Sequence, residues 1–250
     1  MAFQDSDFTL YGSLVMPEDD VTVNIGGGID ETTIVSFTPM GANSSVEVIS
    51  DNAADTMNIT ITGRDVTGAP VSEVVAVNGT TVVAVPGTFK RLLKVVLASA
   101  AAGTITVRKA GAAGDLMSFP AGVLTVRRPL IDISADVAGG AERKYYEKLF
   151  YKNSNATDAL LETKISFVVN PGNAYASALA TAVDDAGTNG GGNNRLVKPA
   201  ALTFDTTEKA IPGDNLAPGS AIGIWIERTL AAGAAAGENT FSLQAAGKGA

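Results

Sequence analysis

The sequence predicts an all-β protein built from two tandem β-sandwich domains, Ig-like or jelly-roll-like, with an extended N-terminal arm and long loops. Val, Ile and Thr, which favour strands, account for 62 of the 250 residues. Glycine contributes a further 27 residues, which is typical of a chain with many tight turns. Short β-branched or alternating runs recur between turn residues, at the spacing expected of a sandwich.

The first half of the chain contains most of these runs. Between two of them, Asn78-Gly79 is the strongest signal for a hairpin turn, and further turns are expected at 26–28 and 63–68. The stretch 89–102 fits a helical stripe or a strand, and its β-branched content favours a strand, a small-residue loop at 98–102 and a hairpin with the next run. The predicted strands are 21–25, 33–37, 46–49, 58–62, 72–77, 81–85 and 104–108.

A connector is expected at 111–129, where glycine and proline recur without periodicity. It places one domain over 1–128 and the other over 129–250. In the second half, 145–153 and 160–170 read as strands, 188–194 as a flexible loop, and 176–183 as helix or strand. Trp225 lies in an alternating run and is expected to cover one face of a sheet. Further strands are predicted at 195–198, 202–205, 222–230 and 240–245.

Charge is distributed unevenly along the chain. The net charge is −8, but residues 1–89 hold 12 acids and one base, whereas residues 90–152 hold 11 bases and 5 acids. Either these are ordinary solvated faces, or an acidic domain adjoins a basic belt that meets an acidic partner. A net acidic chain is a poor general ligand for nucleic acid, so no nucleic-acid partner is expected. The belt would comprise Lys90, Arg91, Lys94, Arg127, Arg128, Arg143, Lys144, Lys148 and Lys152.

The composition also limits the chemistry. The chain has no histidine and no cysteine, which removes disulfides, thiolate sites and triads with an imidazole base. No glycine run has the form of a phosphate-binding loop. The tight acidic groups, at 18–20, at Asp51 with Asp55 and at 184–185, read as solvated turns, with a loop-bridging Ca²⁺ as the alternative. We therefore expect no enzymatic activity and no cofactor.

Two further expectations concern location and the aromatic segment 145–151. The N-terminus lacks the basic start and apolar core of a secretory signal, and no apolar stretch is long enough to span a membrane, so synthesis in a cytoplasm without a membrane partner is expected. The tyrosines and lysines of 143–152 could stack on single-stranded bases. Strand alternation instead favours one face in the core with the lysines at its border.

Two series of motifs resemble structural modules of tailed-bacteriophage virion proteins. The first is ITGRDVTGAPVSEVVAVNGTT, then Phe89-Lys90-Arg91, then AAGTITVRKA. The second is RKYYEKLFYKNSN, followed by PGDNLAPGSAIGIWIERTLAAGAAAGENTFSLQAAG. The stretches that contain them, 61–110 and 143–247, cover about two-thirds of the chain.

This resemblance implies a non-enzymatic virion protein, most like a capsid decoration (cement) protein. Such a protein would bind the major capsid protein or other virion proteins and bridge capsomers, as a homotrimer at three-fold positions. The alternatives are a neck, tail or baseplate component, or a receptor- or glycan-binding adhesin. Attachment is expected through an arm at 1–11, or else through basic residues near the second domain's start. The residues expected at the interface are Phe3, Phe8, Tyr11, Arg143, Lys144, Lys148, Lys152 and Trp225.

Overall fold

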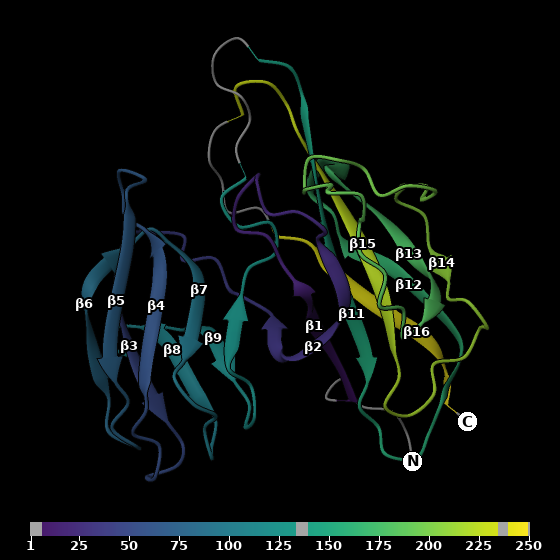
Figure 1. The fold of residues 1–250 in the computed structure, drawn as a ribbon. Coiled ribbons are helices and arrows are strands. Elements are labelled where there is room, and N and C mark those ends of the chain that lie inside the picture. The colour runs from purple at the N-terminus through teal and green to yellow at the C-terminus, as the bar shows by residue number, and fades with distance from the viewer. Residues whose placement is uncertain (1–6, 134–139, 235–239, 250) are drawn as a thin grey trace. The chain divides into compact units, whose positions relative to one another are not determined.

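The computed structural model describes residues 7–133, 140–234 and 240–249 (Figure 1). The chain divides into two compact units. Unit 1 comprises Met1–Asp30 and Leu130–Ala250, and unit 2 comprises Glu31–Pro129. The described residues form strands and loops, with one short 3₁₀ turn at Pro171–Asn173. The predicted all-β fold of sandwich type is confirmed.

Unit 2 consists of two layers of mostly antiparallel strands around an aliphatic core. Ile59 and Ile61 of one layer and Val46 and Val48 of the other are fully buried. One layer also takes in the end of β2 (Gly26–Val35), which pairs in parallel with β10. That layer is ordered β2, β10 (Thr125–Arg127), β7 (Arg91–Leu97), β4 (Asn58–Arg64) and β5 (Pro70–Ala76), and the other β6 (Val83–Phe89), β3 (Ser44–Ser50), β8 (Ile105–Lys109) and β9 (Asp115–Phe119).

Unit 1 is built around β11 (Arg143–Asn153), which pairs with β1 (Phe8–Val15) on one side and with β15 (Ala221–Leu230) on the other. Both faces of β11 are buried, so Tyr145 and Tyr146 are core residues although they point in opposite directions. The outer strand of this sheet is β13 (Tyr175–Val183). A smaller sheet contains β14 (Lys209–Ala210), β12 (Leu160–Val169) and β16 (Ser242–Gly249).

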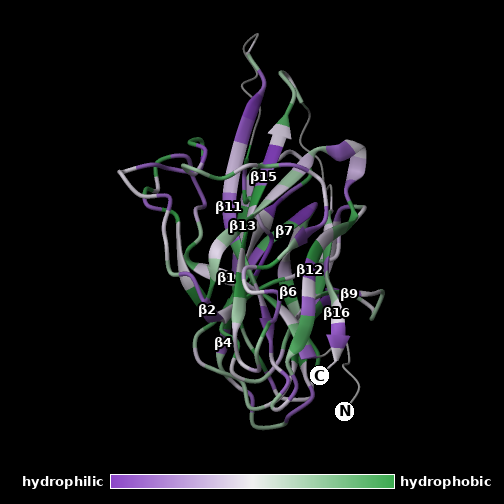
Figure 2. Ribbon diagram, turned by 90° about the vertical axis from the view of Figure 1, so that its right-hand side faces the viewer, coloured by the Kyte–Doolittle hydropathy of each residue, from purple (hydrophilic) through white to green (hydrophobic). Residues whose placement is uncertain are grey.

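An aromatic chain connects the two sheets of unit 1. The ring of Phe241 lies 4.7 Å from that of Tyr175 on β13 and 5.9 Å from that of Phe167 on β12. Hydrophilic and hydrophobic residues interleave along most strands, whereas the buried β15 begins with the continuous apolar run 221–226 (Figure 2). Interleaving is expected of strands with one face toward a core, and a continuous apolar run of a strand with both faces buried.

Most predicted strands coincide with observed ones. The runs at 46–49, 58–62, 72–77 and 104–108 correspond to β3, β4, β5 and β8. The two ambiguous segments are strands, because 89–102 contains β7 followed by a loop and 176–183 lies in β13. The runs at 21–25, 195–198 and 202–205 are not strands, and they make only isolated bridges at Val23 and Asp205.

The expected turns require two corrections. The run 26–28 is the start of β2 rather than a turn, and Gly26 and Gly27 have φ of 99° and 87° within it. Asn78-Gly79 does form a tight turn, in which the Thr81 amide donates to the Asn78 carbonyl over 2.9 Å. However, β5 and β6 belong to different layers, so this turn carries the chain between sheets and does not close a hairpin. Strands β7 and β8 also belong to different layers, so they do not form the expected hairpin.

The expected connector at 111–129 is an integral part of unit 2. It contains β9 and β10, and Phe119 and Val126 are fully buried. Its glycines and prolines mark turns between short strands, which explains its lack of periodicity. The division by contacts lies at 129/130, next to the predicted boundary at 128/129. It differs in assigning the first 30 residues to the unit formed by the C-terminal half.

Candidate interaction surface

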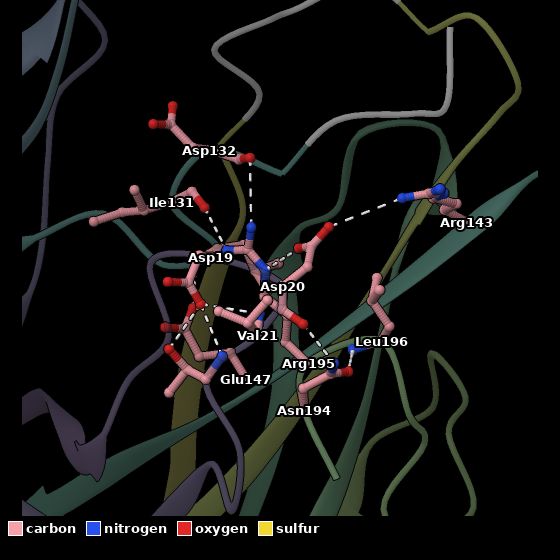
Figure 3. A network of polar contacts seen from close by, with 12 residues as sticks. Asp19, Asp20, Val21, Ile131, Asp132, Arg143, Glu147, Asn194, Arg195 and Leu196 are labelled. Carbon is pink, nitrogen blue, oxygen red and sulfur yellow. Dashed lines mark hydrogen bonds and ion pairs between the residues drawn. The ribbon is translucent and has the colours of Figure 1, made fainter. Parts of the chain in front are cut away.

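A buried arginine organises the loops that cover β11 in unit 1 (Figure 3). Arg195 is 2% exposed, and its Nε donates to Asp20 Oδ1 over 2.7 Å. Its two terminal nitrogens donate to the carbonyl oxygens of Ile131, at 2.6 Å, and Asp132, at 3.5 Å. The Arg195 carbonyl in turn accepts from the Tyr146 amide of β11. Arg195 thus links Asp20 and residues 131–132 through its side chain, and β11 through its backbone carbonyl.

Further contacts fix the same loops. The Asn194 side chain donates to the Asp20 carbonyl, and the Asn24 amide donates to the Asn193 carbonyl over 2.7 Å. Asn189 donates from its side chain to the Val197 carbonyl over 2.8 Å. The loop at 188–194, expected to be flexible, is therefore hydrogen-bonded to residues 20–27 at several points.

Lys148 forms a second buried anchor a few residues along β11. Its side chain is fully buried, and Nζ donates over 2.8–2.9 Å to the carbonyl oxygens of Gly27, Asp185 and Gly187 and to Asp185 Oδ2. Nζ also lies 5.9 Å from the ring of Trp225. Burial lowers the pKa of Lys148, although the Asp185 carboxylate opposes this effect. The ammonium holds the residues after β13 against the start of β2.

The absence of a side chain at Gly26 makes room for this arrangement. A Cβ at Gly26 would lie 3.0 Å from Trp225 Cη2 and 3.2 Å from Lys148 Cδ. Trp225 packs there with Ile25 and Tyr146 in a buried cluster. Glu227 accepts hydrogen bonds from the Tyr146 hydroxyl, at 2.9 Å, and from Lys144, at 2.8 Å. Burial is the main cause that raises the pKa of Tyr146 above its usual range. The hydrogen bond to Glu227 and the charge of that carboxylate raise it further.

The loops held by Arg195 expose aliphatic side chains to solvent. Val21 is 77% exposed, Val23 46%, Leu196 36% and Val197 42%. Val23 bridges to Asn194, so the two loop segments that carry these four residues run side by side. We refer to Val21, Val23, Leu196 and Val197 as the aliphatic loop surface. Glu18 and Asp19, shortly before Val21 in the chain, and Lys198, directly after Val197, are also exposed, so charges of both signs border this surface.

The described residues expected at an interface lie on the neighbouring strands β1, β11 and β15, but they differ in exposure. Phe3 lies outside the described residues. Phe8 and Tyr11 belong to β1 and pair with Asn153 and Phe150, so residues 8–11 form a first strand and not a free arm. Nearby, the rings of Phe8 and Tyr151 are 5.7 Å apart.

The basic residues of the predicted interface differ in their surroundings. Lys148 is fully buried and Trp225 is 4% exposed, so neither has a surface to offer a partner. Lys144 is half exposed and paired with Glu227, while Arg143 lies 3.9 Å from Asp20. Lys152 lies on β11 opposite Thr9 and Ala221. The predicted belt divides between the two units, and Arg127 within it is buried.

The tight acidic groups serve as hydrogen-bond acceptors within the chain. Asp55 accepts from the Ser50 hydroxyl and from the amides of Ala102 and Gly103. Burial would raise the pKa of Asp55, but these donors together hold it below its usual value. Asp184 accepts from the Ala221 amide. Within the described ranges, no group of three or more acidic residues is arranged to hold a metal ion.

Sequence reasoning missed the residues that build this region. Arg195 was assigned to a strand, and its partner Asp20 to a solvated turn 175 positions earlier in the chain. No local pattern links such distant residues. The only available signal was a lone arginine directly after an asparagine- and glycine-rich loop.

Comparison of the chain with protein-family models, curated proteins and solved structures finds no match. In the part of the chain that the structure describes, no helix has the length and apolar character needed to cross a membrane.

Proposed function

We propose that the chain is a non-enzymatic structural protein of a tailed-phage particle, and specifically a capsid decoration protein that bridges neighbouring capsomers. The resemblance of its two motif series to virion modules supports this proposal, and those motifs fall on β4, β5, β8, β11 and β15. A particle protein needs faces that bind neighbouring proteins and a framework that keeps them in place. The all-β units suit this role.

The aliphatic loop surface is the observation that carries the proposal. Exposed aliphatic clusters on a protein are typical of protein–protein contact sites. The loops that display this one are already ordered by Arg195, so binding would cost little further conformational entropy. Charges of both signs at its border, from Glu18, Asp19 and Lys198, favour a neighbouring protein with complementary charges around an apolar centre.

The distribution of charged side chains also favours a structural role. Lys148, Arg195 and Asp55 are buried and hydrogen-bonded to backbone groups, which is how charges that stabilise loops are used. Catalytic acids and bases would need access to a substrate.

Copy number in purified particles tests the proposal. Quantitative mass spectrometry of virions from the phage that encodes the chain should find it at an abundance near that of the major capsid protein. A few to dozens of copies per particle would instead assign it to the neck, tail or baseplate. Its absence from particles would contradict a structural role in the virion.

A further inference from the structure

Strand β5 (Pro70–Ala76) lies at one end of its sheet in unit 2. It pairs with β4 on one side, and no other strand among the described residues continues the sheet beyond it. The pairing with β4 is regular from Asn58↔Ala76 to Arg64↔Pro70, without a register shift. An edge of this kind presents unpaired backbone groups to which another strand can bind.

The hydrogen bonds at both ends of the β4–β5 pair show which groups point outward. The Asp65 amide donates to the Ala69 carbonyl, and the Val77 amide donates to the Met57 carbonyl. Since hydrogen-bonded residues alternate along an antiparallel pair, residues 71, 73 and 75 are directed toward β4. The amides and carbonyls of Ser72, Val74 and Ala76 are therefore directed away from the sheet.

This edge has two of the features that protect edge strands from self-pairing, a proline and an inward-pointing charge, and lacks the others. It has no bulge and no lysine, and its proline is at the first position, Pro70. Glu73, its one charged residue, points inward, where its carboxylate lies near Gly87 of β6. On the outer face Val74 is 58% exposed.

We propose that β5 pairs antiparallel with β5 of a second copy of this chain, about a two-fold axis at Val74. In that register Val74 faces Val74 of the second copy and Ser72 faces Ala76, so all the outward groups exchange about six backbone hydrogen bonds. Glu73 faces Val75, so no like charges are opposed across the new pair. A continuous sheet across the two copies results.

This pairing is independent of the proposed function. It predicts a dimer of copies, or an assembly built from dimers, whereas the virion resemblance implies a trimer. A second copy fits this edge because the exposed Val74 then packs against Val74 and each Glu73 meets a valine rather than another glutamate.

Sedimentation equilibrium of the full chain tests the proposal. The wild type should associate to a dimer with increasing concentration. Val74→Lys places two ammonium groups at the axis and should raise the dissociation constant by about tenfold or more. Val168→Lys is the matched control, because Val168 is a strand residue of unit 1 that is 60% exposed, and it should associate like the wild type.

Cross-linking gives a second readout that does not depend on the effect of a charge. The chain has no cysteine, so Val74→Cys carries a single thiol. A short bis-maleimide should cross-link Val74→Cys into covalent dimers, whereas Val168→Cys should remain monomeric on a denaturing gel. A wild type that stays monomeric up to high micromolar concentration would overturn the proposal. So would an assembly that Val74→Lys leaves unchanged.

Discussion

Lys148 illustrates how a single buried charge sets the position of two loops. Its three N–H groups are shared among four acceptors, three backbone carbonyls and the Asp185 carboxylate. Lys148→Met keeps most of the aliphatic stem but removes the donor. We expect it to lower the free energy of unfolding by about 3 kcal/mol, measured by urea denaturation.

Lys144→Met is the control for Lys148→Met, because Lys144 lies on the same strand but is 46% exposed in its ion pair with Glu227. It should cost under about 1 kcal/mol. An equal decrease in the free energy of unfolding for the two variants would show that the burial of Lys148 does not increase its contribution to stability.

Gly26 tests the packing around Trp225. Gly26→Ala introduces a methyl group at a position with φ of 99°, about 3 Å from the indole ring. Gly68→Ala is matched, since its φ is 89° and a Cβ there would meet nothing within 4 Å. Thermal unfolding should show Gly26→Ala to be less stable than Gly68→Ala by about 1–3 kcal/mol. If the two variants have the same stability, the ring does not constrain this glycine.

At the scale of elements, the turn at 205–209 should respond to acid. Asp205 accepts from Lys209 Nζ, at 2.6 Å, and from the hydroxyl and amide of Thr207, and these donors lower its pKa from 3.8 to about 2. A carboxyl with a depressed pKa stabilises the folded state above its unfolded pKa, and the contribution is lost as the pH falls through the folded value.

The carboxylate of Asp205 is 43% exposed, so solvent screening keeps its contribution under about 1 kcal/mol. In urea titrations, the difference in stability between wild type and Asp205→Asn should shrink as the pH falls from about 4 to about 2. A difference that stays constant over this range would contradict the assignment.

Strand β1 should be essential to unit 1. It pairs with β11 from Phe8↔Asn153 to Gly12↔Leu149, and its loss would expose one side of the central strand. Deletion of residues 2–15 should therefore lower the melting temperature followed by circular dichroism by more than about 10 °C. Deletion of residues 2–6, which retains β1, should have the smaller effect. A melting temperature unchanged by the longer deletion would restore the model of a free arm.

Much of the element pattern could be predicted because strand signals are local. The β-branched runs and the alternation in 145–153 are enough to place β3, β4, β8 and β11. Glycine was interpreted wrongly at two places. Gly26 and Gly27 were expected in a turn but lie within a strand, and the glycines of 111–129 were expected in a connector but lie in turns between strands. Its meaning depends on what packs against it, as Trp225 does against Gly26.

At the scale of the whole molecule, contacts between residues far apart in the sequence could not be predicted. Strand β1 pairs with a strand that begins at Arg143, and Arg195 pairs with Asp20, so unit 1 combines both ends of the chain. A division of the chain into continuous domains by composition cannot reveal a unit made from two separate segments. The same limit hid the aliphatic loop surface, because its four residues come from two segments more than 170 positions apart.

If the chain decorates a capsid through the aliphatic loop surface, it should bind to particles that lack it, and changes to this surface should weaken that binding. Particles prepared from a phage that lacks this gene should bind the added wild-type protein to saturation, in proportion to the capsid protein, in a co-sedimentation assay. The double variant Val21→Asp/Leu196→Asp should bind at least about tenfold more weakly, while Val168→Asp should bind like the wild type. Equal binding by all three proteins would contradict the assignment of this surface, and no binding by the wild type would contradict the decoration role itself.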